Sequence, residues 1–227
     1  MAHLFLIATP IGNLDDITQR AVETLKQVDY IACEDTRTSS VLFRRFGIDK
    51  PTFSFHLHNE HHKTEHMMNI LRGGQSIAII SDAGMPGISD PGFLAVRAAY
   101  QNGFTVSAIP GPDAISTALA ASGLPSDRFT FEGFLPPKKG RQTRVKLIAE
   151  SEITTVVYES PHKLIRFLEQ LYEFAGGERW VCIARELTKK FEEFDRGRLE
   201  RVLQEWKERD SIKGEIVVII AGKEYDE

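Results

Sequence analysis

The sequence is poor in cysteine and contains no long hydrophobic run. Its two cysteines, Cys33 and Cys182, each lie alone in an apolar segment, and no CxxC pair is present. We therefore expect neither a disulfide framework nor a cysteine-rich metal site, and two reduced thiols are typical of a cytoplasmic protein. No stretch approaches the roughly 18 apolar residues that a membrane-spanning helix needs, so no membrane partner is expected.

Several signature motifs are missing as well. A GxxxxGK[ST] loop and a GxGxxG turn after the first strand are both absent, so neither a P-loop nor a standard dinucleotide site is indicated. Five histidines lie between residues 56 and 66, but no HExxH, cysteine or matched carboxylate completes a site, and we expect no metal. With a net charge of −4, the chain has no global field that attracts nucleic acid.

The sequence does contain alternating apolar runs and amphipathic segments. In the first half, the expected strands are 3–9, 29–34, 76–80 and 105–111. The expected helices are 16–27, 38–47, 60–74, 93–103 and 113–123. Uniformly apolar strands separated by helices indicate an α/β fold with a parallel sheet buried on both faces.

The pattern restarts after a segment rich in proline and glycine at 123–138. Here the expected strands are 128–134, 153–159, 179–186, 191–199 and 214–222. Helices are expected at 140–151, 160–176 and 199–210, the second with Ser160 as its N-cap and Pro161 in its first turn. We therefore predict two α/β domains, 1–123 and 124–227. Phe129, Phe131 and Phe134 are predicted to face the core at the period of two of a strand. The alternative is a stacking platform.

Three loops rich in glycine and proline follow apolar strands, at 9–16, 81–92 and 110–114. Any one of them is explained by a tight turn. Ligands of open α/β sheets bind beyond the carboxyl ends of the strands, so three such loops together predict a small-molecule site. Glycines let a ligand approach the backbone, prolines stiffen the loop, and Asp82 and Asp90 can accept hydrogen bonds. These loop residues by themselves indicate a polar organic ligand and do not identify it further.

Seven segments resemble one known family, in order and over almost the whole chain. They are TPIGNLDDIT (9–18), CEDTRTSSVL (33–42), SDAGMPGISDPG (81–92), IPGPDAISTALAASGLPSDRFTFEGFLPPKKGR (109–141), VYESPHK (157–163), ARELTKKFEE (184–193) and KGEIVVIIAG (213–222). The family is the bacterial 16S ribosomal RNA cytidine 2′-O-methyltransferases, a branch of the tetrapyrrole (corrin/porphyrin) methylase superfamily. One departure is PGPDA, where Asp113 stands in a turn that often reads PGPSA or PGASA.

The resemblance implies a class III methyltransferase of two α/β domains, with S-adenosylmethionine in the cleft between them. It implies a homodimer that methylates the ribose 2′-hydroxyl of a decoding-centre cytidine in the 16S rRNA of the small ribosomal subunit. Two other functions stay open. One is a methyltransferase of the same superfamily that acts on a small tetrapyrrole-like molecule, and the other is a non-catalytic RNA-binding factor of the same fold.

The resemblance also assigns residues to the site. Those implied to bind the cofactor are Asp82, Ala83, Gly84, Ser89, Asp90, Pro91, Gly92, Pro110, Gly111 and Pro112. For Phe134, the alternative to a core position is a place beside the adenine of the cofactor. The candidate proton acceptors are Glu159 and Glu186, with Arg185 and Lys189 stabilising negative charge. The alternative for Arg185 and Glu186 is a structural ion pair or a solvated face.

The candidate substrate-binding residues are Glu34, Asp35, Arg37, Lys138, Lys139, Arg141 and Arg144. The last four belong to the basic run at 138–146, which is suited to RNA phosphates. The alternative for this run is a solvated helix face.

Overall fold

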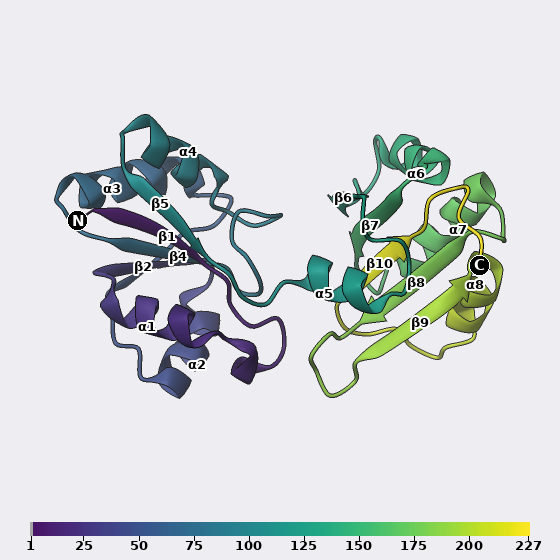
Figure 1. The fold of residues 1–227 in the computed structure, drawn as a ribbon, viewed down its shortest axis with the longest axis horizontal. Coiled ribbons are helices and arrows are strands. Elements are labelled where there is room, and N and C mark those ends of the chain that lie inside the picture. The colour runs from purple at the N-terminus through teal and green to yellow at the C-terminus, as the bar shows by residue number, and fades with distance from the viewer. Residues whose placement is uncertain (1) are drawn as a thin grey trace. The chain divides into compact units, whose positions relative to one another are not determined.

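A computed structural model describes residues 2–227 and resolves them into two compact units. The first extends to Asp113, and the second runs from Ala114 to Glu227 (Figure 1). The predicted boundary lies ten residues later, after residue 123. The difference is α5 (Ala114–Ala121), which contacts β10 (Ile216–Ile220) and so groups with the second unit.

The first unit is built on a fully parallel sheet. Its strands are β1 (His3–Ile7), β2 (Tyr30–Cys33), β3 (Thr52–Ser54), β4 (Ile77–Ile80) and β5 (Thr105–Ile109), in the order β3-β2-β4-β1-β5. Its helices are η1 (Leu14–Asp16), α1 (Gln19–Gln27), α2 (Thr36–Phe46), α3 (Glu60–Arg72) and α4 (Phe93–Gln101). The predicted parallel α/β arrangement is confirmed, with β3 as an additional short edge strand.

Two apolar clusters fix this sheet between its helices. One joins α1 and α2 to the sheet, and the other joins α3 and α4 to the opposite face, as Figure 1 shows. All four residues of β4 are buried, as expected of a central parallel strand covered on both faces. Gly47 ends α2 in the left-handed conformation at φ +62°, the role expected of a glycine after a helix.

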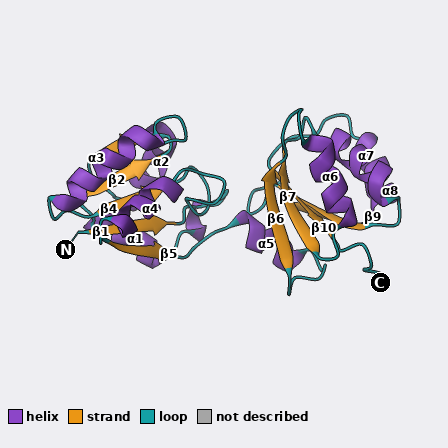
Figure 2. Cartoon of the chain, turned by 90° about the horizontal axis from the view of Figure 1, so that it is seen from above, coloured by secondary structure: helices purple, strands orange, loops and turns teal. Residues whose placement is uncertain are grey.

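The second unit contains a mixed sheet. Its strands are β6 (Phe129–Phe134), β7 (Thr154–Glu159), β8 (Trp180–Arg185), β9 (Glu193–Arg198) and β10, in the order β6-β7-β10-β8-β9. The β6 and β7 strands are parallel, and the other pairs are antiparallel. The helices α6 (Arg141–Glu150), α7 (Leu164–Ala175) and α8 (Leu199–Lys207) build one apolar core on the sheet, with α5 on the other side (Figure 2).

Two local predictions for the second unit are wrong. Ser160 does not cap α7, because residues 161–163 form a turn and the helix begins at Leu164. The phenylalanines of β6 are not all core residues, since Phe129 and Phe134 are 44% and 65% exposed. The reason is that β6 is an edge strand, which pairs with β7 on one side and has no strand on the other side to cover its side chains.

Candidate functional site

The loops after β1 and β4 are joined at the carboxyl edge of the first sheet. Thr9 and Gly84 exchange two backbone hydrogen bonds of 2.9 Å, and the Thr9 hydroxyl donates to the Ser81 carbonyl at 3.0 Å. Thr9 and Ser81 are both buried. Because β1 and β4 are neighbours in the sheet, these bonds extend their alignment beyond the strands and hold residues 81–92, the β4 loop, in place.

Carboxylates from the β2 and β4 ends gather at the same edge. The Asp35 backbone N–H donates to the Asp82 carboxylate at 3.1 Å, and the Asp82 N–H donates to the Glu34 carboxylate at 3.3 Å. Burial, together with the nearby charges of Glu34 and Asp82, raises the pKa of Asp90 to about 6. Burial also raises the pKa of Asp82. Glu34 and Asp35, predicted to bind substrate, therefore lie beside Asp82, which was predicted to bind the cofactor, and these carboxylates together attract a cation.

Arg37 lies beside this cluster and partly neutralises it. Its guanidinium donates to the Asp35 carboxylate at 2.7 and 3.1 Å and lowers the pKa of that carboxyl to about 2. Asp35 also accepts from the Arg37 backbone N–H at 2.8 Å, which makes it the N-cap of α2. Asp35 therefore has a local capping role. The Arg37 side chain is almost fully exposed, and substrate binding by Arg37 stays a prediction.

The far end of the β4 loop is held by Glu60, a residue that the sequence analysis missed. Glu60 is buried at the start of α3, and one of its carboxylate oxygens accepts from the backbone N–H groups of Gly92 and Leu94 at 3.0 and 3.1 Å. A carboxylate at the N-terminus of α4 also interacts favourably with the helix dipole. No local pattern distinguishes this glutamate, because its partners are 32 and 34 residues away in the chain.

The glycines of the β4 loop allow its backbone to adopt left-handed and closely packed conformations. Gly84, Gly87 and Gly92 have φ values of +81°, +86° and +148°, and Ser89 is also left-handed at +67°. A Cβ on Gly92 would lie 3.1 Å from the backbone of Gly87. The glycines are therefore required by the turn itself, whether or not a ligand approaches them.

The β5 loop completes this edge. A Cβ on Gly111 would lie 3.0 Å from that of Ala8, so the loop passes close to the end of β1. The Thr18 hydroxyl donates to the Pro110 carbonyl at 3.5 Å. Pro110 and Gly111 are exposed, as are Ala83 and Ser89 of the β4 loop. The structure thus brings all the predicted cofactor-binding residues to one edge of the first sheet.

Glu159, a predicted proton acceptor, is a buried partner of Arg141 in the second unit. The Arg141 guanidinium donates to Glu159 at 2.7 Å and to Gln170 at 3.0 Å, and the Ser160 N–H donates to Glu159 at 2.9 Å. The Arg141 and Glu159 side chains are each 3% exposed. The prediction that Arg141 contacts substrate phosphate from the surface is wrong, because the helix start turns its side chain into the core.

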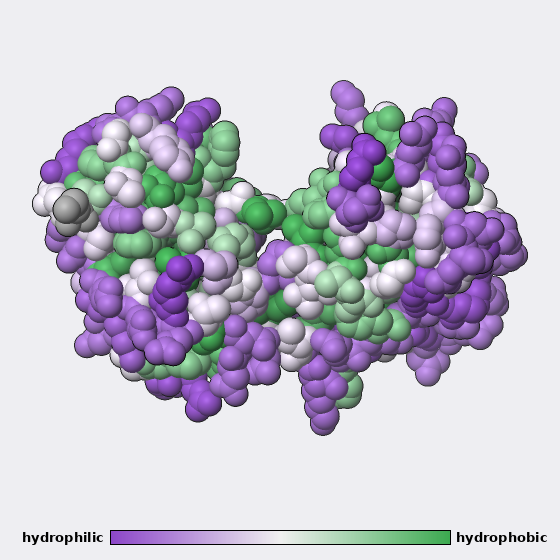
Figure 3. All heavy atoms as spheres, viewed as in Figure 1, coloured by the Kyte–Doolittle hydropathy of each residue, from purple (hydrophilic) through white to green (hydrophobic). Residues whose placement is uncertain are grey.

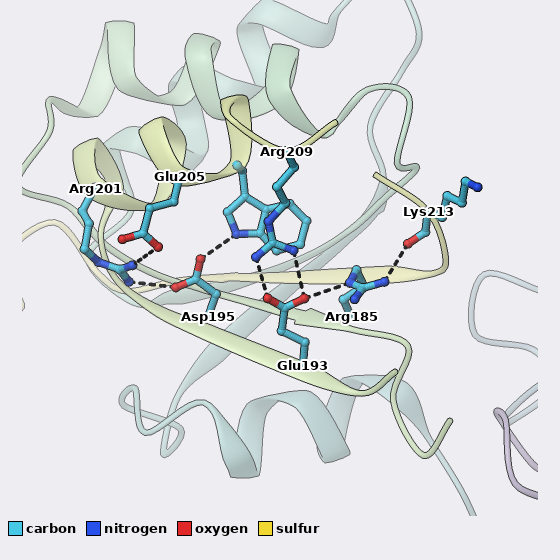
Figure 4. A network of polar contacts seen from close by, with 8 residues as sticks. Arg185, Glu193, Asp195, Arg201, Glu205, Arg209 and Lys213 are labelled. Atoms are coloured by element: carbon cyan, nitrogen blue, oxygen red, sulfur yellow. Dashed lines mark hydrogen bonds and ion pairs between the residues drawn. The ribbon is translucent and has the colours of Figure 1, made fainter. Parts of the chain in front are cut away.

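Arg185 ends β8, Glu186 and Lys189 follow it, and the three residues belong to two ion-pair groups. Arg185 donates to Glu193 at 3.0 Å and to the Lys213 carbonyl at 3.2 Å, and Glu193 also pairs with Arg209 (Figure 4). Lys189 donates to Glu186 at 2.9 Å and thereby lowers the pKa of that carboxyl. Arg185 and Glu186 are thus structurally paired, each with a different partner, and Glu186 is a weakened base.

The basic residues of the run at 138–146 are exposed except for Arg141. Lys138, Lys139, Arg144 and Lys146 lie on the surface, where hydrophilic residues gather on the side of the second unit that carries α6 (Figure 3). Arg144 is 3.4 Å from the Glu132 carboxylate, and Lys146 pairs with Glu150 at 3.8 Å. Lys138 and Lys139 immediately precede α6 and remain candidates for phosphate contact.

Within residues 2–227, no three histidine, cysteine or acidic side chains come together in a way that would hold a metal ion. No helix in this range is both long and apolar enough to cross a bilayer. Burial raises the pKa of the Cys33 thiol to about 11 and that of Cys182 to about 12.

Two α/β units, the first with a glycine- and acid-rich edge on a parallel sheet, define the architecture of a class III methyltransferase. The chain belongs to the tetrapyrrole (corrin/porphyrin) methylases, whose family model matches residues 3–203. It is therefore an S-adenosylmethionine-dependent methyltransferase, as predicted.

Curated relatives extend the match over the whole chain. One is the "Ribosomal RNA small subunit methyltransferase I" of Haemophilus influenzae, 49% identical over 97% of this chain and 78% of the relative. The protein of the same name from Thermotoga maritima is 42% identical over 99% of this chain and 100% of the relative. A crystal structure of uroporphyrin-III-C-methyltransferase from Thermus thermophilus has a TM-score of 0.66 at 17% identity, covering 98% of this chain and 96% of that one, which shows the shared fold.

Replacing Asp90 with asparagine is expected to stabilise the protein at neutral pH. Because the folded-state pKa of about 6 lies above the ordinary 3.8, the folded protein binds more protons than the unfolded chain between these values. Stability therefore falls as pH rises through this window. After allowance for solvent screening, the variant should gain about 1–2 kcal/mol at pH 7 and little at pH 4 in urea unfolding. Asp127→Asn, at an exposed loop position, is the control; equal gains in both variants would contradict the assignment.

Proposed function

We propose that this enzyme methylates the ribose 2′-hydroxyl of a decoding-centre cytidine in 16S rRNA, acting on the small ribosomal subunit as a cytoplasmic homodimer. The observation that carries the proposal is the identity of 42–49% to proteins named as small-subunit rRNA methyltransferases. The EDTR and YESPH segments support the ribose-methylating branch by their resemblance to it.

We assign the donor to the carboxyl edge of the first sheet. S-adenosylmethionine supplies an activated methyl group on a sulfonium cation. The carboxylates of Glu34, Asp82 and Asp90 provide a negative field that suits this cation; burial and, to a smaller extent, the charges of Glu34 and Asp82 raise the pKa of Asp90. The exposed backbone at Ala83, Ser89, Pro110 and Gly111 offers hydrogen-bonding groups for the polar parts of the donor.

The residues of the second unit are assigned to the acceptor. A sugar hydroxyl is a weak acid, so its reaction needs alignment and help with removal of its proton. Lys189 and Arg185 lie at the carboxyl end of β8 and are suited to stabilising phosphate or a developing oxyanion. Glu159 and Glu186 stay predictions as proton acceptors; Lys189 weakens Glu186 as a base, and Arg141 engages Glu159.

The function is tested by mapping methylation in a strain that lacks this protein. Mass spectrometry of 16S rRNA fragments should show one decoding-centre cytidine without its ribose methyl group, and the wild-type gene should restore it. A fully methylated cytidine in the deletion strain would remove the proposal. Methylation of a tetrapyrrole-like compound by the purified enzyme, with rRNA unaffected, would favour the second candidate substrate class.

Reversing the charge of Lys138 and Lys139 is expected to impair rRNA methylation selectively. Loss of two phosphate contacts should raise KM for the ribosomal substrate on the order of tenfold, while donor affinity in calorimetry stays unchanged. The control changes the exposed Lys26 and Lys207 to glutamate, on α1 and α8. Normal turnover by Lys138→Glu/Lys139→Glu would return this segment to the solvated-face alternative.

A further inference from the structure

Two arginines and a tryptophan form a partly exposed cationic cluster in the second unit, outside the predicted site. Trp180 on β8 is the register partner of Arg198 on β9, and Arg196 lies two residues earlier on the same strand. The guanidinium carbons of Arg196 and Arg198 lie 4.6 and 4.8 Å from the centroid of the indole ring. These distances are those of cation–π contacts, which fix both guanidinium groups beside one aromatic surface.

This Arg196–Arg198–Trp180 cluster lies on the face of the sheet away from α8. Side chains alternate along a strand, and a Cβ on Gly197 would point at the Arg201 guanidinium of α8. Arg196 and Arg198 therefore point to the other face, where Arg196 donates to the Gly123 carbonyl at 3.2 Å. The α6–α8 core does not use this face.

Two carboxylates from the segment after β10 occupy the cluster. Arg196 donates one hydrogen bond to each oxygen of Glu227, at 2.6 and 2.9 Å, and Arg198 donates to Asp226. The Tyr225 ring meets Trp180 edge-on, with centroids 6.4 Å apart. The Arg196–Glu227 pair is bidentate, a geometry in which a guanidinium binds carboxylate and phosphate alike.

The carboxylates are held loosely enough to exchange. The side chains of Asp226 and Glu227 are 72% and 48% exposed, whereas those of Arg196 and Arg198 are 27% and 32% exposed. The bidentate Arg196–Glu227 pair is stronger than an average surface ion pair, but both carboxylates stay open to water and salt, which screen their attraction to the guanidinium groups. A polyanion that offers two phosphates together with a base that meets the indole edge gains contacts that the carboxylates lack.

We propose that Arg196, Arg198 and Trp180 form a binding site for the RNA phosphate backbone, and that Asp226 and Glu227 occupy this site until RNA displaces them. The identity of the polyanion as ribosomal RNA rests on the proposed function. The arginines would bind adjacent phosphates, and the indole edge would contact an unstacked base. The two acidic residues would then weaken non-specific RNA binding by competing for the same guanidinium groups.

The test measures binding of a short labelled single-stranded RNA to the full chain by fluorescence anisotropy. Asp226→Asn/Glu227→Gln should tighten binding several-fold, because the competing charges are removed. Arg196→Gln/Arg198→Gln should weaken RNA binding and make its salt dependence shallower. The negative slope of log K for RNA binding against log salt should shrink in magnitude by about 1.4, at about 0.7 for each phosphate of single-stranded RNA. Glu224→Gln, a neutralisation just outside the ion pairs, should change nothing. Thermal melting verifies that each variant is folded.

Unchanged or weaker RNA binding by the neutralised variant would overturn the inference. So would an altered oligomeric state of Arg196→Gln/Arg198→Gln with RNA affinity intact, since the surface would then be a contact between copies of the chain. The same variants are assayed for 16S rRNA methylation. If wild-type enzyme methylates rRNA while the neutralised variant shows no gain in RNA binding, this inference fails and the proposed function stands. If the wild-type enzyme does not methylate rRNA but the expected changes in RNA binding occur, the proposed function fails and this inference stands.

Discussion

Replacing Glu159 with alanine is expected to lower the free energy of unfolding by about 3–5 kcal/mol, because the change leaves a buried guanidinium without its carboxylate. Arg141 cannot recover by moving to solvent, since it is almost fully buried and its Nη1 atom already has no partner in the described structure. Chemical unfolding of the purified variant measures the loss.

The result also separates the two interpretations of Glu159. A catalytic base outside the core would lose activity on substitution with little change in stability. The matched control is Glu150→Ala, which removes an exposed carboxylate paired with Lys146 on α6 and should change stability by less than about 0.5 kcal/mol. A Glu159→Ala protein that is as stable as wild type but inactive would contradict the structural assignment and restore the catalytic one.

Replacing Gly92 with alanine is expected to weaken donor binding at least about tenfold, or 1.4 kcal/mol. The φ value of +148° is one that a residue with a side chain rarely adopts, and the new Cβ would press on the Gly87 backbone at 3.1 Å. Both strains distort the β4 loop, which carries most of the predicted donor-binding residues. Isothermal titration calorimetry with S-adenosylmethionine measures the effect.

Gly74 provides a matched control for backbone strain. It follows α3 with φ +82°, and a Cβ there would meet nothing within 4 Å. Gly74→Ala should therefore reduce stability by about 1 kcal/mol, as expected for a left-handed position, and leave donor affinity unchanged. Equal losses of donor affinity in both variants would show that general destabilisation, and not the β4 loop, causes the effect.

The first sheet could be predicted from sequence because its signals lie in short continuous segments of the chain. Apolar runs such as residues 77–80 are buried on both faces, and the loops that follow them carry glycine, proline and aspartate. Parallel strands place those loops at one edge, which is why the loops after β1, β4 and β5 could be assigned to one site, whereas the contacts of Glu34 and Asp35 with Asp82 were found only in the structure. The short strand β3 was missed because three partly exposed residues carry too little periodicity.

The contacts that the sequence could not provide are long-range ones. Glu60 binds the backbone of Gly92 across 32 residues, and nothing near it in the chain marks that role. Arg141 sits in a run of basic residues that predicts a surface, yet its partner Glu159 is 18 residues away on a buried strand. Charge runs describe composition, whereas burial depends on which side chains the fold turns inward. The same reason separates Arg141 from its exposed neighbours Lys138 and Lys139.

Asp90 illustrates a conflict between stability and function at the same edge. Its ionised form is disfavoured by burial and by two neighbouring carboxylates. At neutral pH, an ionised Asp90 at this position therefore destabilises the folded protein. That arrangement is expected where a protein must hold negative charge ready for a cationic ligand. The stability gain predicted for Asp90→Asn should therefore be accompanied by weaker binding of S-adenosylmethionine.

The most direct test of the central claim is a crystal structure of the enzyme with S-adenosylhomocysteine. We expect the ligand to contact the β4 loop and residues 110–112, with its amino acid or nucleoside part near Asp82 and Asp90. Electron density for the ligand at another part of the chain, with the carboxyl edge of the first sheet filled by its own side chains, would contradict the account.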